Sequence, residues 1–495
     1  MGTRHAWMVL LAAMLVWCGP AGAEQPAERW QATMEPLRRS IDLAVGQAAE
    51  VTLADGTTAR VELLGVEVDR DSLRQAIREV RVRVKVNGRE AVLPSALYCL
   101  PREVGGVQVD CPVVGTYLPA SRRNWWALAG DARLRLWPAG SPWVRPGTFT
   151  YPVNQRWFAS PTQMANEPTY VDGCEPLVRS PIYYHHALDL GGVEGAVEVV
   201  AAAAGVVVTA GAAAWDDAPP GPQQARYDRV TVLDGRGWYH QYDHLASIDA
   251  ALRPGSPVAM GAPVGRLGKE ADSGGWAHLH YQVISRQGDA WGTEEAYAFL
   301  WQAYLAEQSP KVIAVARPHH LVAAGETITL DGRRSWAASG RIASYAWTFT
   351  DGTAAAGPAV QRRYDTPGEY SEILRVTDGA GNEAVDFAVV QVIDPGTPAP
   401  LTLHLAHHPS LGVAPGDAVT FAVRAFGAGG RERIDFGDGT DPVTLESDGG
   451  ADALAPHGYA VTTHRFARAG RYIVTARRSD QRGRTATMRV YVVVE

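Results

Sequence analysis

The hydrophobic pattern of the chain is mostly that of β-strands. Residues 80–86 alternate strictly between valine and a charged residue and lead into Asn87-Gly88, a dipeptide that favours a two-residue hairpin turn. Short runs of the same kind recur along the sequence between Asp-Gly, Gly-Gly and Pro-Gly turn signals. A helical spacing of apolar residues stands out over residues 294–308. The sequence therefore predicts a mainly β protein built from antiparallel sheets.

The length of the chain and its composition divide this pattern into units. A chain of 495 residues should hold several domains, because single cores seldom exceed about 250 to 300 residues. Residues 138–146 and 394–400 are rich in proline and glycine and are typical of linkers. We expect a β-rich N-terminal module over residues 24–145, a central antiparallel β domain over 146–309, and two β-sandwiches over 310–395 and 400–495.

The first 23 residues have the pattern of a signal peptide. A short apolar run over residues 7–16 follows Arg4, and small residues precede a cleavage position near Ala23. The run is too short to span a bilayer comfortably, and no later stretch approaches about 18 uninterrupted apolar residues. We expect a secreted protein of the periplasm or cell envelope without a transmembrane segment, and lipid attachment at Cys18 is a minor alternative because the bulky Trp17 precedes it.

Net charge and cysteine content indicate which partners and which disulfide bonds to expect. A formal net charge of -7 gives no basic field for nucleic acid, which we do not expect as a partner. Removal of the signal peptide leaves three cysteines in a compartment that permits disulfides. Cys99 and Cys111 flank the turn signal Gly105-Gly106, and we expect them to pair across a hairpin. Cys174 stays unassigned, and another pairing is open.

Two histidines occupy a predicted strand over residues 276–284. His278 and His280 are two positions apart, so their side chains should project from one face of the strand while Leu279 points into the core. A rigid sheet could present two imidazoles to one ligand in this way. Alternatively, the two histidines are polar residues on a solvated face of the strand and bind no ligand.

A second cluster, His185-His186-Ala187-Leu188-Asp189, supplies partners for this pair. His185 and Asp189 are four residues apart and can share a side of an extended segment. With His280 they form a His, Asp, His set, and three protein ligands with one open position are typical of catalytic zinc. His186 is a less favoured alternative, because its odd spacing to Asp189 would place the two on opposite faces.

Zinc-dependent hydrolysis also needs a group that accepts a proton and one that stabilises the oxyanion. The sequence has no HExxH helix that would supply a glutamate. Imidazole titrates near neutral pH, so histidines can fill both roles. His278 beside the candidate ligand His280, and His244 at the end of the preceding predicted strand, are the candidates.

These motifs together resemble the lysostaphin-like (LytM-type) zinc metallo-endopeptidases of bacterial cell walls. That family has the order HxGxD, Tyr-x-His-Leu, a glycine-rich loop and HLH. Here His-His-Ala-Leu-Asp at 185–189, Tyr-Asp-His-Leu at 242–245, Pro-Val-Gly-Arg-Leu-Gly at 263–268 and His-Leu-His at 278–280 follow in that order. The resemblance covers residues 149–308 and implies one Zn²⁺ per chain with His185, Asp189 and His280 as ligands, His278 as general base and His244 as the residue that stabilises the transition state.

The chain departs from the family pattern at three places. Ala187 replaces the glycine of HxGxD, and Gln282 stands where the family usually has glutamate. An exposed loop is expected over residues 215–225, where the walls of the family's cleft vary. The N-terminal module carries no ligand spacing and is expected to be structural or to contact substrate; covering of the active site before maturation is the alternative.

The last third of the chain resembles polycystic-kidney-disease-type (PKD) β-sandwiches. Tyr-Ala-Trp-Thr-Phe-Thr-Asp-Gly at 345–352 and Pro-Gly-Glu-Tyr at 367–370 carry the first match, and Ile-Asp-Phe-Gly-Asp-Gly at 434–439 carries a second copy. An internal repeat makes each match more credible. We expect both modules to act as spacers or to bind glycan or protein, and we interpret His319-His320 and His407-His408 as surface residues.

The expected function is a secreted zinc endopeptidase. The resemblance implies peptide bonds of peptidoglycan stem peptides or cross-links as the substrate. Two alternatives stay open: a non-catalytic cell-wall scaffold or activator of other hydrolases, and a peptidase that acts on extracellular proteins.

Overall fold

The structure is a computed structural model that describes residues 31–95, 98–120, 123–162, 164, 184–394, 401–427, 430–481 and 483–495. The expected signal peptide, Cys174 and residues 395–400 of the expected linker lie outside the described residues. Among the described residues, no helix is long and apolar enough to cross a membrane.

The N-terminal module consists of two four-stranded antiparallel sheets, ordered β1-β8-β7-β6 and β2-β3-β4-β5. Valines and leucines from both sheets form one buried cluster. The predicted hairpin at Asn87-Gly88 is present: both residues have positive φ, and Val86 pairs with Arg89. The elements are β1 (Arg39–Leu43), β2 (Ala48–Thr52), β3 (Thr58–Arg70), β4 (Ile77–Val86), β5 (Arg89–Pro94), β6 (Arg102–Val104), β7 (Val107–Val114), η1 (Gly115–Ala120) and β8 (Ala132–Pro138).

The expected disulfide in this module is wrong, because Cys99 and Cys111 are not bonded to each other. In the β6–β7 hairpin, Arg102 pairs with Val109 and Val104 with Val107. Continued along the chain, this register would place Leu100, and not Cys99, opposite Cys111. A shift of one residue turns a side chain to the other face of a strand. Cys111 lies buried in the core of the module, where its thiol donates to the Val113 carbonyl at 3.5 Å.

The central domain is organised around one long strand, β18, inside an eight-stranded sheet with the path β12-β11-β13-β14-β18-β19. Strand β9 pairs with the first half of β18 and β19 with its second half, while β14 pairs with its opposite edge. The elements are β9 (Leu188–Gly191), β10 (Glu198–Val200), β11 (Gly205–Ala210), β12 (Ala213–Ala214), β13 (Val230–Asp234), β14 (Tyr239–Asp243), β15 (Ser247–Ile248), β16 (Pro257–Val258), β17 (Pro263–Arg266), β18 (His278–Gln287), β19 (Ala290–Glu294) and α1 (Tyr297–Gln308).

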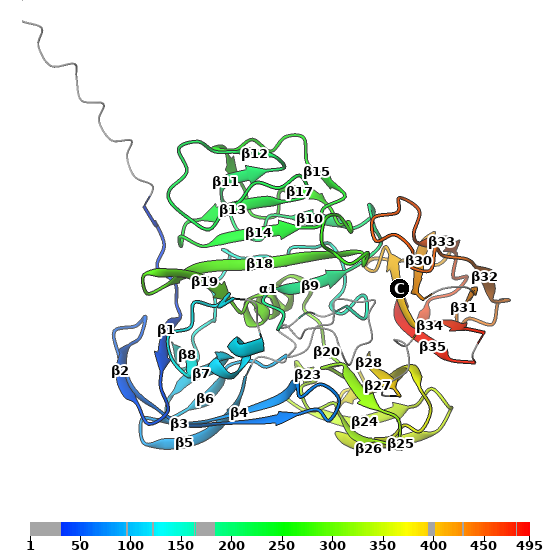
Figure 1. Cartoon of the computed structure of the whole chain (residues 1–495), viewed down its shortest axis with the longest axis horizontal. Helices are drawn as coiled ribbons and strands as arrows, with labels where there is room; N and C mark the ends of the chain where they lie inside the picture. The colour runs from blue at the N-terminus through cyan, green and yellow to red at the C-terminus, as the bar shows by residue number, and fades with distance from the viewer. Residues whose placement is uncertain are drawn as a thin grey trace, which may run out of the picture.

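Helix α1 begins three residues later than the apolar spacing predicts. Residue 294 still belongs to β19, and its carboxylate makes buried ion pairs with Arg38 and Arg135 of the N-terminal module. The helix is buried over most of its length, and Phe299 and Trp301 join the core of the central domain. It lies below the sheet, between this sheet and the other modules (Figure 1).

The two C-terminal sandwiches share a sheet. Strand β27 of the first pairs in parallel with β35 of the second, at Gly368 opposite Thr485, so that one sheet runs β21-β28-β27-β35-β34-β31-β32. The elements of the first are β20 (Val312–Ile313), β21 (His320–Ala323), β22 (Thr327–Asp331), β23 (Trp336–Ala337), β24 (Ile342–Thr348), β25 (Ala354–Ala356), β26 (Ala359–Arg363), β27 (Gly368–Asp378) and β28 (Glu383–Ile393). The second has β29 (Thr402–His408), β30 (Val419–Phe426), β31 (Glu432–Asp435), β32 (Val443–Leu445), β33 (Ala460–His464), β34 (Gly470–Ser479) and β35 (Thr485–Val494).

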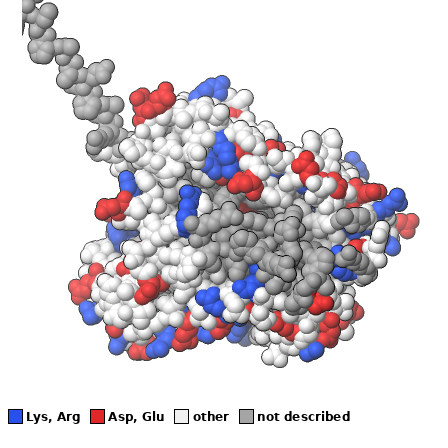
Figure 2. Space-filling view, in the orientation of Figure 1, with Lys and Arg blue, Asp and Glu red and all other residues white. Residues whose placement is uncertain are grey.

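The modules pack directly against the central domain. The second sandwich lies beside the start of β18 (Figure 1), and the buried core of the central domain extends to Tyr98 of the N-terminal module and to Tyr459 of the second sandwich. The surface interpretation of the paired histidines is wrong for His407, which is 2% exposed. Acidic and basic side chains are interspersed over the face that Figure 2 shows.

Candidate metal and catalytic site

The register of β18 with its two neighbours brings the sequence-predicted site residues together. His280 lies opposite Asp189 of β9 on one edge and opposite Asp243 of β14 on the other. His278 lies opposite Gly191 at the start of the strand. His244 follows the last residue of β14 and has a positive φ of 65°, an uncommon conformation for a residue other than glycine.

Three of these side chains converge on one point. The Nε2 atom of His185 lies 3.2 Å from Asp189 Oδ1 and 3.2 Å from His280 Nδ1. Asp189 Oδ1 and His280 Nδ1 are 3.0 Å apart. His185 comes from the segment before β9 and not from an extended strand, but it still lies on the same side as Asp189, as its spacing predicts. These are three metal-ligand atoms on one small triangular face.

The other two histidines present their Nε2 atoms to the same region. His278 Nδ1 donates to the Trp276 carbonyl at 2.9 Å, and His244 Nδ1 donates to the Glu270 carbonyl at 2.7 Å. A carbonyl can only accept, so each ring carries a proton on Nδ1, and in the neutral ring Nε2 keeps its lone pair. The His278 Nε2 atom lies 3.6 Å from Asp189 Oδ1, and the His244 and His278 rings are 4.8 Å apart.

Both carbonyls belong to one segment, residues 269–277 between β17 and β18, which we call the site loop. Its first half is held by the central domain. The Tyr227 hydroxyl accepts from the Ala271 amide at 2.9 Å, and Arg226 donates to Asp272 at 2.8 Å. The conformation of the site loop therefore sets the direction of both imidazoles.

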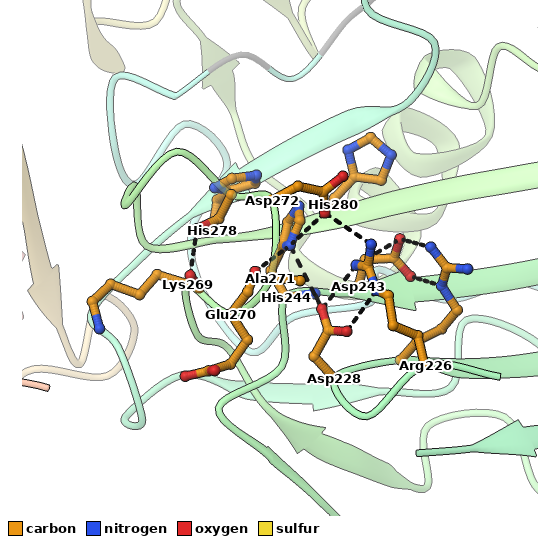
Figure 3. Close-up of polar contacts among 12 residues, drawn as sticks. Arg226, Asp228, Asp243, His244, Lys269, Glu270, Ala271, Asp272, His278 and His280 are labelled. Carbon is orange, nitrogen blue, oxygen red and sulfur yellow. Dashed lines mark hydrogen bonds and ion pairs between the residues drawn. The ribbon is translucent and has the colours of Figure 1, made fainter. Parts of the chain in front are cut away.

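Two buried carboxylates lie near His244: Asp228 holds its backbone, and Asp243 is the residue before it (Figure 3). Asp228 accepts the His244 amide at 2.9 Å and binds Arg226 with both oxygens, at 2.6 and 2.8 Å. Arg229 binds both oxygens of Asp243 at 2.6 Å. Burial alone would raise the pKa of Asp228, but the hydrogen bonds from His244 and Arg226 outweigh it and hold that pKa well below its usual value.

Burial also sets the protonation of the catalytic candidate on β18. His278 is 3% exposed, and burial lowers the pKa of its imidazole to about 4, against the opposing effect of Asp189. The ring is therefore neutral at pH 7. Burial alone would raise the pKa of Asp189, but the hydrogen bonds of the His185 and His280 rings oppose it, and that pKa is held well below its usual value, so Asp189 is charged.

Other residues that the sequence singles out have packing roles. His186 stacks on Trp125 of the N-terminal module at 3.8 Å between ring centroids. His240 lies in the core between Asp234 and Tyr281, and Gln282 donates to Thr293 at 2.6 Å. Three aromatic residues near the site are also packed: Tyr184 against Tyr117, Tyr242 against Tyr281, and Trp276 against Phe426.

The sequence gives no signal for several residues that build the site. The Glu270 and Trp276 carbonyls are backbone groups that any residue would offer. Asp228 stands in an ordinary polar segment, and its contact with His244 depends on how β13 and β14 pair.

Comparison with known proteins agrees with this geometry. Residues 183–291, which include all five candidate site residues, match peptidase family M23. The match lies within the central domain. Residues 308–392 match the PKD domain, which covers the first of the two sandwiches.

Individual relatives match only parts of the chain. A microbial collagenase from Vibrio alginolyticus is 30% identical over 109 residues, which are 20% of this chain and 13% of that protein. A solved structure described as a glycyl-glycine endopeptidase lytM from Ruminococcus gnavus is 24% identical, with 23% of this chain and 44% of that chain covered and a TM-score of 0.19. Csd3 from Helicobacter pylori is 13% identical, with 53% and 82% covered and a TM-score of 0.20.

Proposed function

We propose that the protein is a secreted zinc metallo-endopeptidase that hydrolyses peptide bonds of bacterial peptidoglycan. The observation that carries the proposal is the convergence of His185 Nε2, Asp189 Oδ1 and His280 Nδ1 within 3.0 to 3.2 Å of one another. The match of this segment to a peptidase family supports the same reading.

The donor set suits zinc in chemistry and in size. Neutral imidazole and carboxylate are common zinc ligands, at about 2.0 to 2.2 Å from the ion. Two such ligands at the tetrahedral angle lie about 3.3 Å apart, close to the separations of the three atoms here. His185, Asp189 and His280 would hold the ion and leave a fourth position open. When bound there, zinc would supply a Lewis acid that polarises the scissile carbonyl and acidifies water.

His278 is assigned the proton transfer. Its Nε2 lone pair faces the ligand cluster, within 3.6 Å of Asp189 Oδ1. It accepts the proton of the attacking water, and the Trp276 carbonyl stabilises the imidazolium through the proton on Nδ1. The same nitrogen then returns the proton to the amine that leaves.

His244 is assigned the stabilisation of the oxyanion. It donates from Nε2 in its protonated form, since Nδ1 is already engaged by the Glu270 carbonyl. Asp228 and Asp272 lie 3.7 and 3.9 Å from the Nδ1 atom of His244. Their negative charges balance the positive charge of the imidazolium. The positive φ of His244 points the ring at the cluster and is retained because Asp228 holds its amide.

Mass spectrometry of digests determines which substrate the protein cleaves. Purified peptidoglycan, a glycine-rich peptide and collagen are incubated side by side with the mature protein; the collagen arm is included because of the similarity to a microbial collagenase. We expect new peptide termini from peptidoglycan. Cleavage of collagen alone would favour a peptidase for extracellular proteins, and no cleavage by a zinc-loaded protein would favour a non-catalytic cell-wall role.

A further inference from the structure

The second half of the site loop, residues 275–277, is held by the second sandwich as well as by the central domain, whose Gly192 amide donates to the Ala277 carbonyl at 3.2 Å. Arg424 Nη1 donates to the Gly275 carbonyl at 2.7 Å. The Tyr459 hydroxyl accepts from the Ala277 amide at 2.9 Å. Between these two contacts, the indole of Trp276 stacks on Phe426 with 4.4 Å between centroids and 6° between planes. The three residues immediately before His278 thus each contact a different residue of the second sandwich.

Arg424 is a rigid anchor for this contact. It is fully buried, and Asp448 binds its guanidinium with both oxygens at 2.9 and 2.6 Å. Gly275 makes the approach feasible: it has a φ of +84°, and a Cβ there would lie 2.7 Å from the Arg424 Nη1 atom. A side chain at this position would strain the backbone and displace the guanidinium.

Tyr459 is held in place by a chain of hydrogen bonds. Its hydroxyl accepts from the Ala277 amide, so its own proton goes to His404 Nδ1 at 2.7 Å. With Nδ1 accepting, His404 Nε2 donates to Thr162 Oγ1 at 3.2 Å. The chain runs from the central domain through the second sandwich and back to the central domain.

We propose that the second sandwich, residues 401–495, is a positioning element for His278. Arg424, Phe426 and Tyr459 hold residues 275–277, and so place the Trp276 carbonyl that receives the His278 Nδ1 proton. His244 does not depend on this contact, because Tyr227 and Arg226 hold the half of the loop that carries Glu270. The proposal rests on the proposed role of His278 in catalysis, and it gives the module a function besides spacing or glycan binding.

The test compares two tyrosine variants of the full chain. Tyr459→Phe removes the acceptor for the Ala277 amide and keeps the ring. Tyr472→Phe is the control, since its hydroxyl donates to the Arg468 carbonyl at 2.8 Å within the same module. For Tyr459→Phe we expect about tenfold faster hydrogen exchange at the Ala277 amide, as loss of a buried hydrogen bond implies. We also expect kcat to fall about tenfold, as misplacement of a catalytic group implies, with KM and bound zinc unchanged. Tyr472→Phe should match the wild type in exchange at the Ala277 amide, in kcat, in KM and in bound zinc.

A readout that does not need activity separates this proposal from the proposed function. Ring ¹⁵N shifts of His278, assigned with His278→Ala, report which nitrogen carries the proton. The wild type should show the Nδ1–H form, and Tyr459→Phe and Phe426→Leu should show a mixture of tautomers. Unchanged exchange at Ala277, or an unchanged His278 tautomer and kcat in both variants, would overturn the positioning role. If the wild type cleaves no peptide while the tautomer responds, the proposed function fails and the positioning of His278 stands.

Discussion

At the scale of single residues, the two histidines of β18 differ by the partners of their ring nitrogens. His280 turns Nδ1 toward Asp189 and His185, whereas His278 gives Nδ1 to a backbone carbonyl and turns Nε2 toward the cluster. Under the proposed mechanism, the His280 nitrogen serves as a ligand and the His278 nitrogen as a base. The groups that hold the second ring nitrogen commonly set such roles.

This difference predicts that substitution of the two histidines has different effects. His280→Ala should lose bound zinc, because one of three ligands is gone. His278→Ala should keep about one zinc per chain and lose about 10² to 10⁴-fold in kcat, the usual contribution of a general base. Metal analysis by mass spectrometry and steady-state kinetics on the same preparations check both. Loss of zinc in His278→Ala would contradict the assignment.

Asp228 gives a second prediction at this scale. Asp228→Asn keeps an acceptor for the His244 amide and weakens the two-oxygen contact with Arg226. We expect kcat to fall about tenfold with KM nearly unchanged, because His244 acts only on the charge that develops in the transition state. Asp249→Asn, at a half-buried position of the same domain where the side chain accepts from the Ala251 amide at 2.8 Å, serves as the control. A rise in KM with unchanged kcat would instead indicate a role in substrate binding.

At the scale of elements, the alternation of the sequence predicts the central strand and the common face of His278 and His280. It does not predict where the strand begins. The expected start was residue 276, and β18 begins at His278. Local alternation cannot show that residues 275–277 are taken up by contacts with Arg424, Phe426 and Tyr459, which are about 150 or more positions away in the chain. The helix start differs for a similar reason, since Arg38 and Arg135 hold Glu294 in β19.

The junction between β19 and α1 predicts a dependence of stability on pH. Burial raises the pKa of Glu295 from its ordinary value of 4.5 to about 7. A carboxyl with a raised folded pKa stabilises the fold fully below its unfolded pKa, and this stability is lost as the pH rises toward the folded pKa. A shift of this size corresponds to a loss on the order of 3 kcal/mol. Glu295→Gln should therefore raise the Tm relative to the wild type at pH 8 and much less at pH 5.

The control for this prediction is Glu50→Gln, an exposed glutamate on β2. It should leave the Tm difference between pH 5 and pH 8 unchanged. Thermal unfolding of the three proteins across this range checks the prediction. An equal effect of Glu295→Gln at both pH values would show that the carboxyl is not responsible.

At the scale of the whole molecule, the sequence predicts a mainly β fold, which the structure has, and the PKD-type character of the first C-terminal sandwich, which the match over residues 308–392 supports. It does not predict that the modules pack as one body. The parallel pairing of β27 with β35 and the shared core around Tyr459 join segments that are distant in sequence. The hydrophobic pattern does not predict contacts of this kind, because the residues that form them have the same alternation as any other strand.

Metal binding should be visible in the stability of the entire chain. Since folding brings His280 to the segment that carries His185 and Asp189, zinc bound to the folded form stabilises it by mass action. Chelation should lower the Tm of the wild type, and zinc should restore it. His280→Ala should have a Tm that does not respond to either treatment. An equal response of the variant would place the bound metal elsewhere.

The proposed zinc at His185, Asp189 and His280 makes peptidoglycan hydrolysis dependent on the metal. This dependence is tested most directly by measuring peptidoglycan hydrolysis while zinc is titrated into the chelated mature protein. The rate should rise from background in proportion to bound zinc and reach its plateau at one ion per chain. Hydrolysis by the zinc-free protein at the rate of the loaded one would contradict it.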